Sequence, residues 1–199
     1  MTAGHDLVVV VLAGGEGRRI GGDKPQRRLA GTRLIDHALR LAARWTDEPI
    51  VAARDLAQLG PLDIPVIADD PDIAGPLGGL AAGLDYARRA AAARLLTIPA
   101  DMPFLPDDLA DRLAAALDAA GGGAALGQSG GQLYPICALW EVGVKDALPG
   151  YLATGRRSLR GFADTVGFVA VEWPTAGGDR FLNINDAEDL ARAEGLWRA

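Results

Sequence analysis

The segment Leu7–Leu12 constrains the fold of this chain more than any other part of the sequence. Its letters, LVVVVL, are all apolar and mostly β-branched, so a strand formed here is hydrophobic on both faces. A strand of this kind is typical of a parallel sheet that helices cover on both sides. Similar apolar segments predict further strands at 49–53, 65–69, 95–101 and 167–173, with a strand or hairpin in 127–140.

Segments with the helical spacing of apolar residues separate these strands. Thr32 is the expected N-cap of the first, and either Asn185 or Asp186 caps the last. The alternation predicts a three-layer α/β fold with a mainly parallel sheet. Without a linker or a repeat in its 199 residues, the chain is expected to form one domain, residues 1–199. The predicted helices lie within residues 32–45, 75–96, 106–120, 144–155 and 185–197.

The charge of the chain is unevenly distributed. Its formal net charge is −6, which argues against a general nucleic-acid-binding protein. Residues 1–44, however, carry eight basic against four acidic side chains, whereas residues 45–199 carry twelve against twenty-two. A basic segment in an acidic protein favours a small anionic ligand.

Two further features bear on the cellular setting. No apolar run is long enough to span a bilayer and no leader-like segment precedes Leu7, so we expect a cytoplasmic protein without membrane contact. The single cysteine, Cys137, cannot form an internal disulfide. Because His5 and His37 stand far away in unpromising settings, we interpret Cys137 as a core residue rather than a nucleophile.

The stretch VLAGGEGRRIGGDKPQ, residues 11–26, has the composition of an anion-binding loop after a strand. It does not match a Walker A loop, because Asp23 interrupts the spacing and Pro25 replaces the Ser or Thr that binds magnesium. It does not match the dinucleotide motif either, because Ile20 occupies the place of the third glycine. A plain surface turn would not need its arginine pair. Lys24 is one of only two lysines in the chain, and an ammonium suits a phosphate met as a point charge.

Acidic residues follow two other predicted strands. Asp69 and Asp70 stand at the end of the third strand, and Asp101 ends the fourth. The carboxyl ends of parallel strands meet at one edge of a sheet, where open α/β folds bind their ligands. We therefore expect the glycine loop and these acids to converge on one site.

These pieces together resemble a known family. LAGGEGRRIGGDKP is similar to the signature L-A-G-G-x-x-x-R-M-G-x-D-K of molybdenum cofactor guanylyltransferases (MobA-type) in the nucleotidyltransferase superfamily. The resemblance implies a Rossmann-like nucleotide-diphospho-sugar transferase fold, nucleotide-binding in its N-terminal part and molybdopterin-binding in its C-terminal part. The implied reaction transfers GMP from GTP to the terminal phosphate of molybdopterin, with Mg²⁺ as cofactor and pyrophosphate as leaving group. Further matching stretches are VIADDPDIAGPLGGLAAGL, LTIPADMPFLPDDL, YPICALW, TGRRSLRGF and FLNINDAEDLARAE.

The resemblance also implies roles for individual residues. Arg19 and Lys24 would neutralise the triphosphate and Asp101 would bind the metal, which makes these three the implied catalytic residues. Asp69 is expected to contact ribose or guanine, with Asp70 as its nearest rival. The residues implied in nucleotide binding are Leu12, Ala13, Gly14, Gly15, Lys24, Asp69 and Asp101.

Two further groups are implied on the molybdopterin side. One is a basic cluster of Arg156, Arg157 and Arg160, and the other is the asparagine pair Asn183 and Asn185. Each group has an ordinary alternative. The arginines could be exposed cations at a helix end, and the asparagines could close a strand or cap a helix.

Two positions depart from the family pattern. The second strand ends in Ala52-Ala53-Arg54 where the family often carries an asparagine, and Tyr134 stands where a histidine is common. Both bear on substrate choice rather than on reaction class. A cytidylyltransferase or sugar-nucleotide transferase on the same scaffold therefore stays open, as does a non-catalytic carrier of nucleotide or molybdopterin. The expected partners are GTP and molybdopterin, with transient contacts to molybdoenzymes or other cofactor-biosynthesis proteins.

Overall fold

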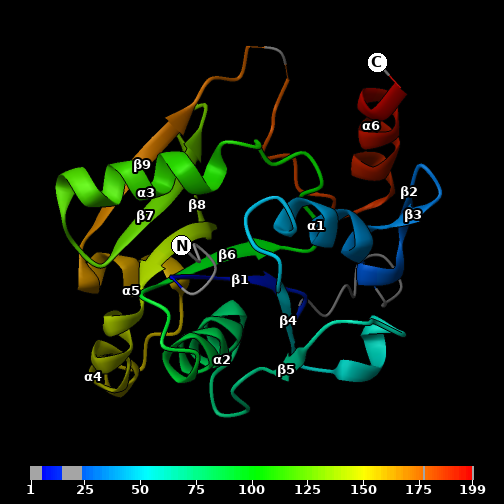
Figure 1. The fold of residues 1–199 in the computed structure, drawn as a ribbon. Coiled ribbons are helices and arrows are strands. Elements are labelled where there is room, and N and C mark those ends of the chain that lie inside the picture. The colour runs from blue at the N-terminus through cyan, green and yellow to red at the C-terminus, as the bar shows by residue number, and fades with distance from the viewer. Residues whose placement is uncertain (1–5, 15–23, 177, 199) are drawn as a thin grey trace.

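The computed structural model describes residues 6–14, 24–176 and 178–198. Its main feature is a seven-stranded sheet in the order β5-β4-β1-β6-β8-β7-β9 (Figure 1). Strands β5, β4, β1 and β6 run parallel, and β8 is antiparallel to both of its neighbours. The predicted α/β fold with a mainly parallel sheet is confirmed. The strands are β1 (Leu7–Leu12), β4 (Ile50–Ala53), β5 (Val66–Ala68), β6 (Arg94–Pro99), β7 (Ala124–Ser129), β8 (Gln132–Glu141) and β9 (Phe168–Trp173).

Helices cover both faces of this sheet, as the apolar character of β1 requires. Val9 and Val11 pack on one face against α1 and α3, and Val8 and Val10 pack on the other against α2, α4 and α5 (Figure 1). Val9, Val10 and Val11 are completely buried. The helices are α1 (Leu34–Ala42), α2 (Pro76–Arg89), α3 (Leu109–Ala120), α4 (Leu148–Ala153), α5 (Leu159–Val166) and α6 (Ala187–Arg198).

The structure corrects two details of the predicted helices. Thr32 does not cap α1, because it pairs with Leu29 in a small sheet of β2 (Arg28–Leu29) and β3 (Thr32–Arg33), and Arg33 takes the N-cap position. The helix predicted over 144–155 divides into a 3-10 segment, η4 (Val142–Ala147), and α4. Pro149 explains the change, because it has no N–H to continue the helical hydrogen bonding.

Other predictions of local structure are confirmed. Strands β7 and β8 form the hairpin that was one of two alternatives. Asp186 rather than Asn185 caps α6, since its carboxylate accepts a hydrogen bond of 2.9 Å from the backbone N–H of Asp189. Cys137 is fully buried in the core, where its thiol lies 3.5 Å from the sulfur of Met102.

A small separate core attaches the C-terminal segment to the N-terminal half. Leu182, Ile184 and Ala193 pack against Leu29 and Leu34, so α6 lies beside the β2–β3 ribbon (Figure 1). This packing brings residues 182–193 back to the sheet edge at which β1 and β6 end.

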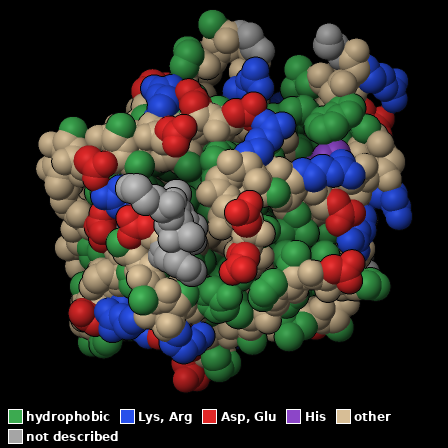
Figure 2. Space-filling model, viewed as in Figure 1, with side chains coloured by type: hydrophobic (Ala, Val, Ile, Leu, Met, Phe, Trp, Pro, Cys, Tyr) green, Lys and Arg blue, Asp and Glu red, His purple; other side chains and the backbone are tan. Residues whose placement is uncertain are grey.

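Charged side chains of both signs are interspersed on the molecular face shown in Figure 2, which displays no continuous basic surface.

Across the described parts of the chain, no helix combines the length and the apolar character that crossing a membrane would require.

Candidate functional site

The carboxyl ends of four adjacent parallel strands form one edge of the sheet, and the predicted site residues follow these ends. In sheet order, Asp69 follows β5, Arg54 follows β4, Gly14 lies just beyond β1, and Asp101 lies just beyond β6. Backbone hydrogen bonds extend the sheet into this region, including one of 3.0 Å from the N–H of Asp69 to the carbonyl of Ala53. The predicted convergence is confirmed for Gly14, Asp69 and Asp101, whereas residues 15–23 of the glycine loop lie outside the described residues. A cavity of about 520 Å³ is lined by Leu12, Gly14, Arg54, Asp69, Ala74, Gly75, Pro76, Gly79, Pro99, Asp101 and Ile136; we call it the edge cavity.

Lys24 and Asp101 form an ion pair at one end of the edge cavity. Lys24 Nζ also donates a hydrogen bond of 2.9 Å to Asn185 Oδ1, across 161 positions of sequence. The backbone N–H of Ile184 donates to the carbonyl of Asp101 at 3.0 Å, which fixes the C-terminal segment against β6. The structure thus joins three predicted site residues, Lys24, Asp101 and Asn185, in one cluster.

Buried oxygen atoms without a hydrogen-bond partner gather around this edge. Asp69 Oδ1, Asp101 Oδ1 and Asn183 Oδ1 are three such atoms among the residues that the structure describes. A buried polar atom left unpaired typically costs about 1–3 kcal/mol, so each of these atoms needs a partner, which a bound ligand, an ion or a water molecule would supply.

Asp69 is a second acid that lines the edge cavity, besides Asp101. It is only 8% exposed, and burial raises the pKa of its carboxyl to about 6, although the positive charge of Arg54 acts in the opposite direction. The carboxylate of Asp70 instead accepts a hydrogen bond of 2.9 Å from the N–H of Asp72, within the turn before α2. Of the two rivals, the structure therefore places Asp69 in the cavity and Asp70 in the turn.

Glycines leave room around Asp69. A Cβ atom at Gly14 would lie 2.6 Å from Asp69 Oδ2, and one at Gly79 would lie 2.8 Å from the Leu12 side chain. Both approaches are too short for a real side chain. Gly75, with φ of 72°, is the N-cap of α2, and it lines the same cavity together with Pro76, so the helix N-terminus lies at this cavity. Gly75, Pro76 and Gly79 of the GPLGG segment thus line the cavity.

Part of the predicted backbone cradle takes part in the sheet. The N–H of Ala13 donates to the carbonyl of Ala52 at 2.8 Å, and the carbonyl of Leu12 accepts from the N–H of Ala100 at 3.1 Å. Gly15 and Arg19 lie outside the described residues, so their roles stay predictions.

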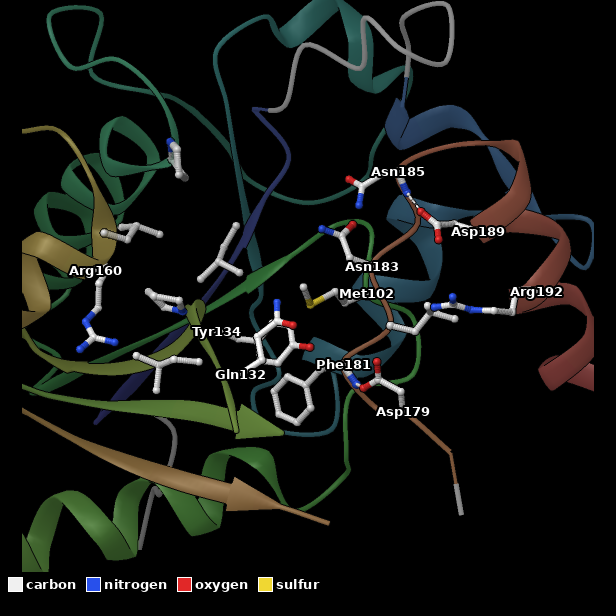
Figure 3. A pocket seen from close by; sticks show the side chains of 16 residues that line it. Met102, Gln132, Tyr134, Arg160, Asp179, Phe181, Asn183, Asn185, Asp189 and Arg192 are labelled. Carbon is white, nitrogen blue, oxygen red and sulfur yellow. Dashed lines mark hydrogen bonds between the residues drawn. The ribbon is translucent and has the colours of Figure 1, made fainter. Parts of the chain in front are cut away.

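A second cavity, of about 530 Å³, lies between β8, the start of α5 and the C-terminal segment (Figure 3). Tyr134 and Phe181 stack in it with ring centroids 4.9 Å apart. Burial, followed by the negative charge of Asp179, raises the pKa of the Tyr134 hydroxyl. We call this space the β8 cavity; its polar lining includes Gln132, Arg160, Asp179, Asn183, Asn185, Asp189 and Arg192.

The arginine cluster predicted for the second substrate divides in the structure. Arg160 lines the β8 cavity, whereas Arg156 and Arg157 do not. Arg157 donates to the carbonyl of Leu152 at 2.8 Å, and Arg156 lies over the ring of Tyr151. For these two, the alternative of cations at the end of a helix describes their contacts in α4 better.

Sequence reasoning missed two arginines that line the cavities. Arg54 is the first residue after β4, so its position at a strand end was a readable signal. Arg192 stands three positions after Asp189 on α6, and both line the β8 cavity. Nothing in the composition of that helix distinguishes them from ordinary surface charges.

Known proteins are similar to this chain in sequence and in fold. The model of the MobA-like NTP transferase domain matches residues 9–166 of the chain. The chain belongs to this family. Membership makes it a nucleotidyltransferase, and the matched residues contain most of β1 and all of β4, β5 and β6, whose ends form the edge cavity.

Individual relatives extend the match beyond residue 166. A molybdenum cofactor guanylyltransferase of Cereibacter sphaeroides is 42% identical over 194 residues, covering 96% of this chain and 97% of the relative. One of Bradyrhizobium sp. is 43% identical, covering 94% and 91%. The crystal structure of molybdopterin-guanine dinucleotide biosynthesis protein A from Archaeoglobus fulgidus superimposes with a TM-score of 0.77 at 25% identity, covering 96% and 98%. The family likeness therefore includes the C-terminal segment that carries Asn183 and Asn185.

Proposed function

We propose that this chain transfers GMP from GTP to the terminal phosphate of molybdopterin and releases pyrophosphate. The observation that carries the proposal is the position of the Lys24–Asp101–Asn185 cluster. The edge cavity and the β8 cavity adjoin, since Pro76 and Ile136 line both. Asp101 lines the first cavity and Asn185 the second, so the cluster stands where two bound substrates would meet.

The proposed chemistry asks for positioning and charge stabilisation. A terminal phosphate oxygen of molybdopterin attacks the α-phosphorus of GTP, and a new P–O bond forms. The bond from the α-phosphorus to its leaving oxygen breaks, and pyrophosphate departs with the electron pair. Lys24 would balance the charge that develops on the phosphate oxygens, and the two cavities would hold the reactants in line.

Magnesium is part of the proposal, and the residues at the cluster fit it. Mg²⁺ is usually held by one or two carboxylates together with phosphate oxygens and waters. The described residues contain no group of three or more His, Cys, Asp or Glu side chains arranged for a metal, but Asp101 offers a buried oxygen without a partner. When bound, the ion would supply positive charge to the triphosphate. Asp101 would hold it, and Lys24 would move from the carboxylate to the phosphates.

The assignment of substrates to cavities follows from their linings. The edge cavity has the strand ends, the helix N-terminus and Asp69 that suit a nucleotide. The β8 cavity has the stacked Tyr134 and Phe181 with Arg160 and Arg192, which suit a flat ring system carrying a phosphate. We assign GTP to the first and molybdopterin to the second. The proposal also includes a cytoplasmic location and transient contact with the molybdoenzymes that receive the product.

The decisive experiment measures pyrophosphate release from GTP, CTP and UTP in the presence of molybdopterin and MgCl₂. We expect release from GTP alone, together with a dinucleotide product detected by mass spectrometry. Release from CTP alone would establish the cytidylyltransferase alternative. If an Asp101→Ala chain makes no dinucleotide but still supports a molybdoenzyme in cells, the carrier alternative is correct.

A further inference from the structure

Arg54 stands between the two halves of the nucleotide site without an acidic partner among the described residues. It is the first residue after β4, between Gly14 beyond β1 and Asp69 after β5. Its side chain lines the edge cavity and forms no ion pair with any residue that the structure describes. Its hydrogen bond from Nη2 to the carbonyl of Pro71 is long, at 3.4 Å. The guanidinium is therefore available to a ligand.

Asp69 presents the complementary group on the neighbouring strand. Its carboxylate is buried in the same cavity, and Oδ1 has no partner among the described residues. The backbones of Gly14 and Gly79 pack close to the carboxylate, since a Cβ atom there would lie 2.6 Å from Oδ2 and 3.2 Å from Oδ1. The Asp69 carboxylate, an acceptor, and the Arg54 guanidinium, a planar group of donors, thus line one cavity without pairing with each other. They follow neighbouring strands, which lie about 4.8 Å apart.

The phosphates belong at the other end of the cavity. Lys24 and Asp101 lie beyond β1 and β6, on the far side of Gly14 from Arg54. A nucleotide whose triphosphate meets Lys24 places its base toward Arg54 and Asp69. The Ala13 N–H and the Leu12 carbonyl are already hydrogen-bonded within the sheet, so these two backbone groups do not select the base.

We propose that Arg54 reads the O6 and N7 edge of guanine, beside Asp69, whose contact with ribose or guanine the family resemblance already implies. Asp69 accepts hydrogen bonds from N1–H and the 2-amino group, and Arg54 donates to O6 and N7. Adenine would present an amino group to Arg54 and an acceptor to Asp69, and cytosine lacks the ring that reaches both. The inference rests on the proposed function and names the residues that choose its nucleotide. It also gives Arg54 the place of the asparagine that the family often carries near Ala52.

The first test removes N7 from the ligand. Equilibrium binding of GTP and 7-deaza-GTP, with MgCl₂ at pH 8, is measured for the unmodified chain, Arg54→Ala and Arg54→Lys. We expect the unmodified chain to bind 7-deaza-GTP about tenfold more weakly than GTP. Arg54→Ala should bind both nucleotides equally. Arg54→Lys should also lose the discrimination, because an ammonium keeps the charge without the fork.

Arg89→Ala is the matched control, since it removes an exposed arginine that lines neither cavity. It should keep the tenfold discrimination. If Arg54→Ala also keeps it, the assigned role of Arg54 is wrong.

The second test exchanges the donors that Asp69 would read. Xanthosine triphosphate carries an oxygen in place of the 2-amino group, and the amide that the Asp69→Asn substitution introduces could donate to that oxygen. We expect Asp69→Asn to bind XTP at least about tenfold more tightly than GTP, the reverse of the unmodified chain. An Asp69→Asn chain that loses GTP without gaining XTP contradicts the assignment. If the Asp69→Asn variant does not fold, the comparison of GTP with 7-deaza-GTP in the Arg54 variants tests the proposal.

The two tests separate this inference from the proposed function. No binding of GTP by the unmodified chain would overturn both. Guanylyl transfer with unchanged discrimination in the Arg54 variants would overturn the inference alone.

Discussion

The edge cavity and the β8 cavity adjoin, but the chain builds them in different ways. The edge cavity takes its polar groups from residues that directly follow parallel strands, such as Arg54, Asp69 and Asp101. The β8 cavity takes Tyr134, Arg160 and Asn183 from a hairpin, a helix start and an irregular C-terminal segment. The difference teaches that the order of parallel strands brings the polar groups of the edge cavity together, whereas the polar groups of the β8 cavity depend on how distant segments pack.

Asp101 lies where the two regions meet, so its loss should have the largest effect. Asp101→Ala is expected to lower kcat for guanylyl transfer by about 10³-fold, because the chain would lose the carboxylate proposed to hold Mg²⁺. The measurement is single-turnover transfer with saturating GTP and molybdopterin. Asp47→Ala, an exposed acid, is the control. EDTA should bring the unmodified chain to the rate of the variant, and a variant that retains full activity would exclude the proposed metal site.

Gly14 tests the edge cavity by itself. Gly14→Ala is expected to weaken GTP binding by about 10²-fold, because the new Cβ would lie 2.6 Å from Asp69 Oδ2 and displace it. Calorimetry gives the affinity, and steady-state kinetics give KM for molybdopterin, which should not change. Gly143→Ala is the matched control, since a Cβ there meets nothing within 4 Å. A parallel rise in both constants would mean that the two regions are not independent.

Asp69, in the edge cavity, makes the folding stability of the chain depend on pH. Burial raises the pKa of its carboxyl from 3.8 to about 6 in the folded chain, so folding stability declines as the pH rises from about 4 through 6. Asp69→Asn removes this dependence. Without nucleotide, the advantage of the variant in free energy of unfolding should grow by about 2 kcal/mol between pH 4 and pH 7. Urea unfolding at several pH values measures it, and a constant difference would show that Asp69 is ionised normally.

Asn183 tests the β8 cavity, and its effect should be the smallest. Its buried Oδ1 has no partner among the described residues. Asn183 lines the β8 cavity and not the edge cavity (Figure 3). Asn183→Ala is expected to raise KM for molybdopterin about tenfold with no change in GTP affinity. Gln58→Ala provides the control, because that side chain donates to Asp55 and lines neither cavity. A loss of GTP affinity would place Asn183 with the nucleotide instead.

The sequence predicted several polar residues of the edge cavity, because the carboxyl ends of parallel strands lie along one edge of a sheet. Once β1, β5 and β6 are recognised as buried strands, the residues that follow them share an edge. Asp69 and Asp101 were therefore predictable. Arg54 also follows a buried strand. It was not predicted as a site residue, because only the missing asparagine of the family near Ala52 was considered there. Arg156 and Arg157 were grouped with Arg160, although only Arg160 lines the β8 cavity, because a cluster of like charges in sequence does not reveal which side chains face a cavity.

By itself, the sequence determined the fold class, the strand ends that bear chemistry and the family likeness of the loop before Lys24. These depend on local patterns: apolar runs, turn residues and spacing. Only the tertiary structure decided that Asn185 contacts Lys24, that Asp69 rather than Asp70 is buried in the cavity, and that Arg160 alone of its cluster lines the second site. The physical reason is that such contacts depend on the order of the strands and on packing between segments that lie far apart in the chain. The packing of Ile184 against Leu29 and Leu34 is one example.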